Sequence, residues 1–161
     1  MKNQIEKIII AATICLAIVS CSQPKTMETK KNETSAIFPM EEPVNGETFT
    51  GKVWHTELVP SDSTLTTVVG NVYFEPGARS HWHSHPAGQI LIITDGAGFH
   101  QIEGQPKQNL KKGDVVTCPP NVLHWHGASP EIGMQQLFVV PNTEKGIVEW
   151  KHAVTDAEYS N

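Results

Sequence analysis

The sequence predicts an all-β protein whose folded part is one small β-barrel, or jelly roll, of antiparallel strands. From Thr48 onward, short runs rich in valine, isoleucine, threonine and aromatic residues are separated by glycine, proline, asparagine and aspartate. This is the pattern of strands joined by tight turns. In two of these runs, histidines recur at every second position, which places them on one face of a strand. Many short strands with metal-binding residues on one face are typical of a barrel.

The first 20 residues have the pattern of a lipoprotein signal peptide. Lys2 and Lys7 precede an apolar run over residues 8–19, and these 12 residues are too few to span a bilayer. The run ends in Ile-Val-Ser-Cys, which resembles a bacterial lipoprotein box with lipid on the sulfur of Cys21. The alternative is an ordinary cleaved signal in which Cys21 is incidental. A lipid anchor predicts a protein of the bacterial cell envelope, with its domain facing the periplasm or the exterior.

Residues 21–46 are expected to form the lipidated end and a flexible linker, and residues 47–159 the folded domain. Positions 22–36 hold almost no apolar residue, so this segment cannot pack against a core. The formal net charge is −5, and Arg79 is the single arginine, which argues against nucleic acid as a partner. Contact with the membrane is therefore expected only through the lipid anchor.

Nine strands are expected in the domain, followed by one short helical turn. In chain order the strands are Lys52–Val59, Thr64–Phe74, Ser80–His85, Gln89–Thr94, Gly98–Glu103, Asp114–Cys118, Leu123–Gly127, Gly133–Val140 and Ile147–Lys151. Near the end of the chain, Thr155 and Glu158 have the spacing of a capping box, which predicts the start of the helical turn.

Residues 90–93 form a continuous apolar run instead of an alternation. Both faces of this strand must therefore be covered. One face can look into the barrel. The other can be covered by a second subunit, which predicts a homodimer, or by a second sheet of the same chain.

The stretch from Gly77 to Gly96 brings polar side chains to one place. His81, His83 and His85 stand at alternate positions, so their imidazoles share one face of a strand. A turn at residues 86–88 then reverses the chain. The side chain of Gln89, which starts the next strand, can therefore return toward the same place.

A second stretch, residues 113–126, ends in His124-Trp-His126 and adds two imidazoles at the same spacing. Imidazole nitrogen is the commonest metal ligand in proteins, and a barrel interior can hold several of them while leaving positions open for substrate. The two stretches together predict a metal site. The alternative is a hydrogen-bonded polar core without a metal.

Both stretches resemble the two sequence motifs of the cupin family. The matching positions are Gly77, His83, His85, Gln89 and Gly96 in the first motif, and Gly113, Pro119 and His124 in the second. Two of the residues depart from the family: Gln89 stands where most cupins carry glutamate, and Ala128 stands where the second motif usually carries asparagine.

More narrowly, residues 47–159 resemble small single-domain cupins that include manganese-dependent hydroxynitrile (mandelonitrile) lyases. The resemblance rests on the segments His-x-His-Pro-x-Gly-Gln, Gly-Asp-Val-Val, His-Trp-His-Gly-Ala and Val-Thr-Asp-x-x-Tyr. It implies a cupin-type β-barrel and an activity on a small molecule.

The resemblance also implies that His83, His85, Gln89 and His124 bind a metal ion. Four neutral ligands leave the full 2+ charge on the ion, so the ion should be held less tightly than with glutamate but should act as a stronger Lewis acid. The resemblance implies Mn²⁺, whereas the residues themselves also suit Fe²⁺, Zn²⁺ and Ni²⁺.

His126 is the candidate catalytic residue. It stands two residues beyond His124 on the same face, about 6–7 Å along the strand, and a neutral histidine is a suitable general base. In a lyase of the resembled kind, His126 would take the hydroxyl proton of a cyanohydrin, whose carbon–carbon bond then breaks to give an aldehyde and cyanide. The alternatives for His126 are a buried core residue or a fourth imidazole ligand.

Two other functions remain open at this stage. The first is another reaction of the same family, carried out by a dioxygenase or a decarboxylase. The second is a non-catalytic, metal-dependent module that binds a ligand.

Several further residues are expected to be structural or without a role in the site. Arg79 is expected to tie its loop to a carboxylate, and His81 could support the ligands from behind. Residues expected to pack in the interior are Trp82, Trp125 and Cys118. Residues expected to face solvent are His55, His100 and His152. Gln136 occupies a position at which some lyases of the resembled group carry a histidine.

Overall fold

The structure is a computed structural model, and it describes residues 38, 40, 43–44 and 46–161. The predicted signal peptide, the lipidation site at Cys21 and most of the predicted linker lie outside the described residues and stay predictions. Within the described part of the chain, no helix is long and apolar enough to cross a membrane.

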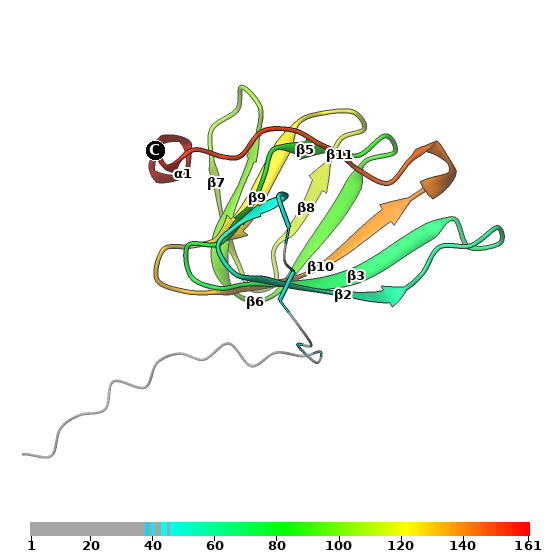
Figure 1. The fold of residues 1–161 in the computed structure, drawn as a ribbon, viewed down its shortest axis with the longest axis horizontal. Coiled ribbons are helices and arrows are strands. Elements are labelled where there is room, and N and C mark those ends of the chain that lie inside the picture. The colour runs from blue at the N-terminus through cyan, green and yellow to red at the C-terminus, as the bar shows by residue number, and fades with distance from the viewer. Residues whose placement is uncertain (1–37, 39, 41–42, 45) are drawn as a thin grey trace, which may run out of the picture. The chain divides into compact units, whose positions relative to one another are not determined.

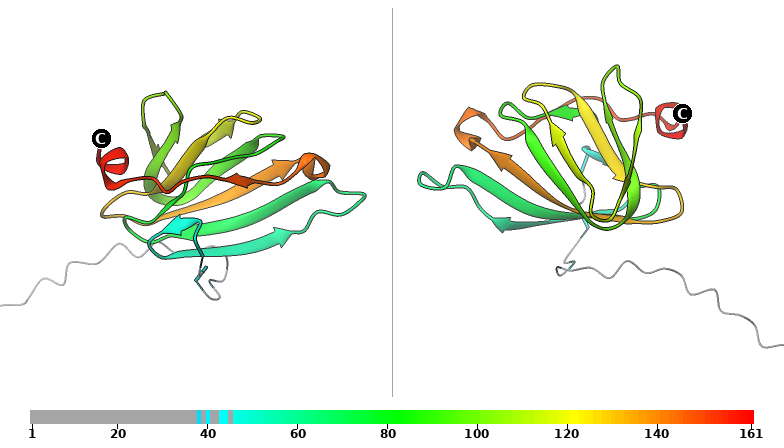
Figure 2. Two further views of the ribbon diagram at one scale, coloured as in Figure 1. Left: turned by 45° about the horizontal axis from the view of Figure 1, so that its top comes forward. Right: turned by 180° about the vertical axis from the view of Figure 1, so that it is seen from behind.

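Two antiparallel sheets curve around a common interior and share one long strand (Figures 1 and 2). One sheet has the order β2-β3-β10-β6-β8, built from Val53–Val59, Thr67–Phe74, Met134–Pro141, Gln89–Ile102 and Val115–Cys118. The other has the order β1-β4-β9-β6-β7, built from Phe49–Thr50, Arg79–Ser80, His124–Ala128, β6 again and Gln108–Lys111. The short strands β5 (His83–Ser84) and β11 (Glu149–Trp150) extend the second sheet through β9. This confirms the predicted all-β barrel.

Strand β6 joins the two sheets because it runs without a break where the sequence predicts two strands. Its first half pairs with β8 and β10, and its second half pairs with β7 and β9. The strand can continue because of Gly96, which lies in the gap between the two predicted strands, and Gly98, which starts the second of them. A Cβ atom at either position would collide with the backbone of Gly133 or Gly127. The two glycines therefore allow close contact between strands.

The other predicted strands are largely confirmed, with two corrections. The predicted strand Ser80–His85 is divided into β4 and β5 by a bend at Trp82. The predicted strand Ile147–Lys151 shortens to β11, and β1 and β7 were not expected. Two helical segments follow β10: a 3-10 turn, η1 (Thr143–Lys145), and α1 (Asp156–Ser160), which begins with the predicted capping box of Thr155 and Glu158.

The C-terminal segment is held against the barrel by a second hydrophobic cluster, separate from the barrel interior. Trp82 and Trp125 pack edge to face there, with Val154 and Tyr159. Arg79 donates hydrogen bonds to the Val154 carbonyl and forms an ion pair with the carboxylate of Asp156 at 2.6 Å. Both tryptophans therefore pack as predicted, and Arg79 binds a carboxylate as predicted.

The described residues cover only one face of the apolar run at residues 90–93. Leu91 and Ile93 point into the barrel and are 0% and 1% exposed. Ile90 lies on the outer face and is 37% exposed, beside Val115 of β8, which is 61% exposed. No second sheet of the described residues therefore covers this outer face fully, and the homodimer stays a prediction.

Candidate metal centre and its pocket

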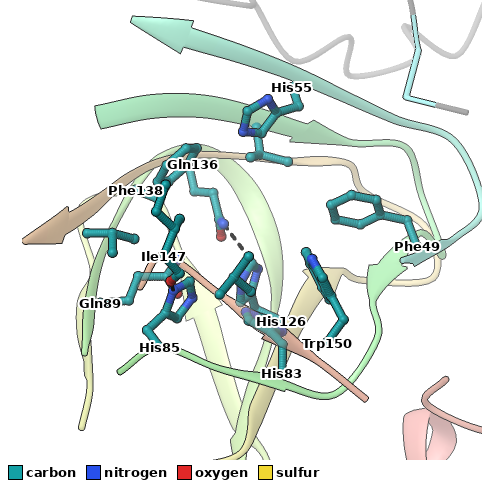
Figure 3. Close-up of a pocket in the computed structure, with 13 residues that line it drawn as sticks. Phe49, His55, His83, His85, Gln89, His126, Gln136, Phe138, Ile147 and Trp150 are labelled. Carbon is teal, nitrogen blue, oxygen red and sulfur yellow. Dashed lines mark hydrogen bonds between the residues drawn. The ribbon is translucent and has the colours of Figure 1, made fainter. Parts of the chain in front are cut away.

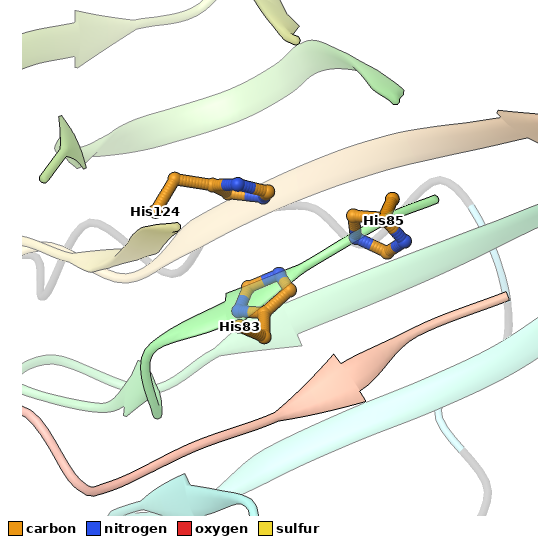
Figure 4. Close-up of side chains that lie close together, drawn as sticks. All are labelled: His83, His85 and His124. Carbon is orange, nitrogen blue, oxygen red and sulfur yellow. The ribbon is translucent and has the colours of Figure 1, made fainter. Parts of the chain in front are cut away.

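Three histidines converge inside the barrel (Figure 4). His83 on β5 and His124 on β9 are direct partners across the two strands, and His85 follows β5 just before the turn at residues 86–88. One ligand nitrogen from each lies within 4.8 Å of the other two, and all three side chains are buried. This spacing allows the three nitrogens to bind a single cation.

Each of these three imidazoles is oriented by a main-chain carbonyl group. The contacts run from Nδ1 of His83 to His81 O at 2.9 Å, from Nδ1 of His85 to Ile147 O at 2.6 Å, and from Nδ1 of His124 to Val122 O at 3.0 Å. Because a carbonyl oxygen only accepts, each Nδ1 carries the hydrogen and each Nε2 presents its lone pair. The Nε2 atom of His85 is buried and has no hydrogen-bond partner among the described residues. The donor set is therefore prepared for a metal ion.

Gln89, the fourth predicted ligand, lies beside the histidines. It starts β6, is 6% exposed, and places its Oε1 atom 3.3 Å from Nε2 of His124. An amide oxygen at this place can complete a site of three imidazoles. Behind it, the Sγ atom of Cys118 lies 3.8 Å from the same oxygen. Burial raises the pKa of the Cys118 thiol to about 12, so it stays protonated and the predicted buried, unreactive cysteine is confirmed.

The histidines of the cluster are neutral at physiological pH. Burial, followed by the neighbouring imidazoles, lowers the pKa of His83 well below its ordinary value. Burial is also the largest cause that lowers the pKa of His124, to about 3. Neutral imidazole is the form that binds a cation.

The histidines expected to face solvent behave in three ways. His100 is 3% exposed, with its Nε2 atom 3.4 Å from Sγ of Cys118, so that prediction is wrong. His100 points inward because β6 has a register shift against β10 between Ile93 and Asp95, which moves the inward positions from Leu91 and Ile93 to His100. His55 is exposed, yet its ring stacks on Phe138 at the pocket. His152 is exposed as predicted.

The metal-free protein should lose stability as the pH falls from 7 to 4. Burial lowers the pKa of His100 from 6.5 to about 4, so in this range the unfolded chain binds a proton that the folded protein excludes. The free energy of unfolding should therefore fall with decreasing pH, by roughly 3 kcal/mol from His100 alone. Urea denaturation at both pH values measures this. The control variant His152→Ala, at an exposed position, should show the same fall. A free energy of unfolding that does not change with pH would contradict the prediction.

His126 lies next to the cluster without belonging to it. Its ring centre is 5.2 Å from that of His83, and its side chain is 4% exposed. The Nδ1 atom of His126 lies 3.0 Å from Nε2 of Gln136 (Figure 3). Its Nε2 atom has no hydrogen-bond partner among the described residues. His126 thus has one nitrogen available to a bound molecule, while its role as general base stays a prediction.

An apolar pocket of about 110 Å³ opens beside these side chains (Figure 3). His83, His85, Gln89, His126 and Gln136 form its polar side, with His55. No charged side chain of the described residues lines it. Its remaining walls are aromatic or aliphatic: Phe49, Val72, Phe138, Val140, Ile147, Val148 and Trp150. The sequence alone does not indicate which residues form these walls, because they lie on strands that are brought together only when the barrel closes.

His81 enters the site through its main chain. The bend at Trp82 ends the strand on which His81 and His83 were expected to share a face. The carbonyl oxygen of His81 nevertheless accepts the hydrogen bond from Nδ1 of His83. The support for the ligands therefore comes from the backbone of His81.

The fold and the site together define the class of protein. It is a small antiparallel β-barrel that holds three convergent imidazoles and one amide, residues suited to binding a metal ion, in its interior. Residues 70–140 match the family model described as the cupin domain. The chain is also 40% identical over 111 residues to an (R)-mandelonitrile lyase of Granulicella tundricola, an alignment covering 69% of this chain and 85% of that protein. The chain belongs to the cupin family.

Solved structures agree with this assignment. A cupin-like protein from Thermotoga maritima has 48% sequence identity and a TM-score of 0.73, over 77% of this chain and 94% of that one. A DMSP lyase from Ruegeria pomeroyi has 20% identity and a TM-score of 0.55, over 68% of this chain and 54% of that one. The second likeness shows the fold alone.

Proposed function

We propose that this protein is a metal-dependent cupin lyase that cleaves or forms the carbon–carbon bond of a small neutral molecule of the cyanohydrin type. One observation carries the proposal: two histidines of the three-histidine site, His83 and His85, line an apolar pocket. His126 lines the same pocket, and its Nε2 atom has no hydrogen-bond partner among the described residues. The 40% identity to an (R)-mandelonitrile lyase supports the same activity.

His83, His85, His124 and Gln89 would hold the metal ion, and we propose Mn²⁺, with Fe²⁺, Zn²⁺ and Ni²⁺ as alternatives. When bound, such an ion supplies Lewis-acid polarisation of a substrate oxygen. The chain contributes a set of four neutral ligands, which leaves the charge of the ion undiminished. His126 is the residue that we propose to meet the substrate oxygen with its Nε2 atom.

The walls of the pocket favour an apolar substrate. No charged side chain of the described residues lines the pocket, so the proposed metal ion would be the only partner there for a charged group of a substrate. The aromatic walls Phe49, Phe138 and Trp150 suit a ring, which packs well against other aromatic side chains. These walls support an aromatic cyanohydrin such as mandelonitrile as the substrate.

Cleavage of mandelonitrile should depend on the metal. We expect the metal-free protein to be inactive and the Mn²⁺-loaded protein to release benzaldehyde, measured by its ultraviolet absorbance. Elemental analysis should find about one ion per chain. Release no faster than in buffer in both forms would contradict the lyase. Oxygen consumption by the Fe²⁺-loaded protein would indicate a dioxygenase, and ligand retention without turnover would indicate a binding module.

We also propose that the outer face of β6 and β8 forms a homodimer. Ile92 pairs with Val115, and together with Ile90 they present apolar surface on neighbouring strands. Val115→Lys should place a charge on this surface and shift the protein from dimer to monomer in sedimentation velocity. The control Leu65→Lys changes a leucine that is 49% exposed outside this face and should leave the dimer intact. A monomeric unmodified protein would contradict the proposal.

A further inference from the structure

Apart from the proposed metal ligand His85, two residues that line the pocket have a buried polar atom without a hydrogen-bond partner among the described residues: His126 at Nε2 and Gln136 at Oε1. The side chains are 4% and 0% exposed, and both line the pocket. Buried polar groups in proteins are almost always paired, so each exception calls for an explanation. The cluster of His83, His85 and His124 does not include either residue.

The contact between the two side chains decides which hydrogen-bonding role each free atom has. Nε2 of Gln136 lies 3.0 Å from Nδ1 of His126 (Figure 3). An amide nitrogen only donates, so Nδ1 accepts, and the neutral imidazole carries its hydrogen on Nε2. The pocket therefore receives a donor from His126 and an acceptor, Oε1, from Gln136.

We propose that His126 and Gln136 form a donor–acceptor pair that binds one hydroxyl group of the substrate. A hydroxyl group accepts one hydrogen bond and donates another, so it satisfies both buried atoms at once, whereas a carbonyl or an ether oxygen can only accept. The class of ligand is a small, neutral, apolar alcohol. The inference rests on the proposed function in taking this pocket as the substrate site.

The arrangement assigns Gln136 a direct contact with the substrate, a role that the sequence did not suggest. It also refines the role of His126. With its hydrogen on Nε2, the neutral imidazole meets the substrate as a hydrogen-bond donor. Action as a general base at the same atom requires the Gln136 amide to turn, so that Oε1 accepts from Nδ1–H.

Binding of benzyl alcohol and toluene to the metal-free protein tests the pair, because the two ligands share a ring and differ by one hydroxyl group. Chemical-shift titration should show that Gln136→Leu weakens binding of benzyl alcohol roughly threefold to tenfold, the effect of one lost hydrogen bond. Toluene binding should stay unchanged. The near-isosteric variant Gln136→Met should behave in the same way, and it serves if Gln136→Leu does not fold. The control Gln105→Leu, at an exposed turn outside this pocket, should bind both ligands normally.

The ¹⁵N shifts of His126 provide a second readout, with the signals identified by their loss in His126→Asn. The unmodified protein should carry hydrogen on Nε2, and Gln136→Leu should show shifts averaged between the two tautomers. Hydrogen on Nδ1 in the unmodified protein would overturn the inference, as would benzyl alcohol binding unaffected by both Gln136 variants. Neither measurement uses a metal or turnover. If the protein shows no lyase activity, the inference about His126 and Gln136 can therefore still hold. If the binding and tautomer measurements contradict that inference, the lyase proposal can still hold.

Discussion

Replacing His124 with alanine should abolish metal binding and reduce mandelonitrile cleavage at least a hundredfold. His124 is fully buried, and its Nε2 atom lies 3.3 Å from Oε1 of Gln89 and within the nitrogen cluster of His83 and His85. Loss of a residue that merely supports a ligand already costs about 10- to 100-fold in metal affinity, so loss of the ligand itself should cost at least as much. Elemental analysis after dialysis measures the ion, and the benzaldehyde assay measures the turnover.

Thermal unfolding separates loss of the ion from loss of the fold. A ligand that binds only the folded state stabilises it, by about 2.7 kcal/mol at a concentration 100 times its Kd. Mn²⁺ should therefore raise the Tm of the unmodified protein and leave that of His124→Ala unchanged. His152→Ala removes an exposed histidine and should respond to Mn²⁺ like the unmodified protein. Stoichiometric Mn²⁺ in His124→Ala would contradict the assignment of His124 as a ligand.

The histidine cluster was predictable because it depends on local geometry. The alternation of His83 with His85, the turn that follows and the return of Gln89 are properties of neighbouring residues, and strand periodicity fixes them. The pairing of His83 with His124 is not local, and only the resemblance to the cupin motifs indicated it. The capping box at Thr155 is again local and was predictable for the same reason.

The pocket and the inward side of β6 depend on contacts between distant strands, which one sequence does not reveal. The sequence predicts a gap between two strands at residues 95–97, because the close contacts of Gly96 and Gly98 with neighbouring strands cannot be read from it. The register shift of β6 against β10 between Ile93 and Asp95 then turns His100 inward, against the expectation that it faces solvent. Likewise, the contact of Gln136 with His126 requires the register that places β10 beside β6 and β6 beside β9.

Replacing His126 with asparagine should reduce turnover by about two to four orders of magnitude, the range that a positioned proton-transfer group contributes, without removing the metal. Asparagine lacks the Nε2 atom that faces the pocket. Its Oδ1 atom can still accept a hydrogen bond from the Gln136 amide, which now contacts Nδ1, so the local structure should be preserved. The benzaldehyde assay and elemental analysis of the Mn²⁺-loaded variant measure the two quantities together.

This combination of results distinguishes the three roles open to His126. A fourth ligand would lose the metal along with turnover, because its nitrogen would be part of the binding site. If His126 only packs in the interior, the variant should keep both the metal and the turnover, provided that thermal unfolding shows it to be folded at the assay temperature. His152→Asn makes the same chemical change at an exposed position and should keep both metal and turnover. Lost turnover with retained metal is therefore the outcome that assigns His126 to the reaction, since His126 lines the pocket and its Nε2 atom has no hydrogen-bond partner among the described residues.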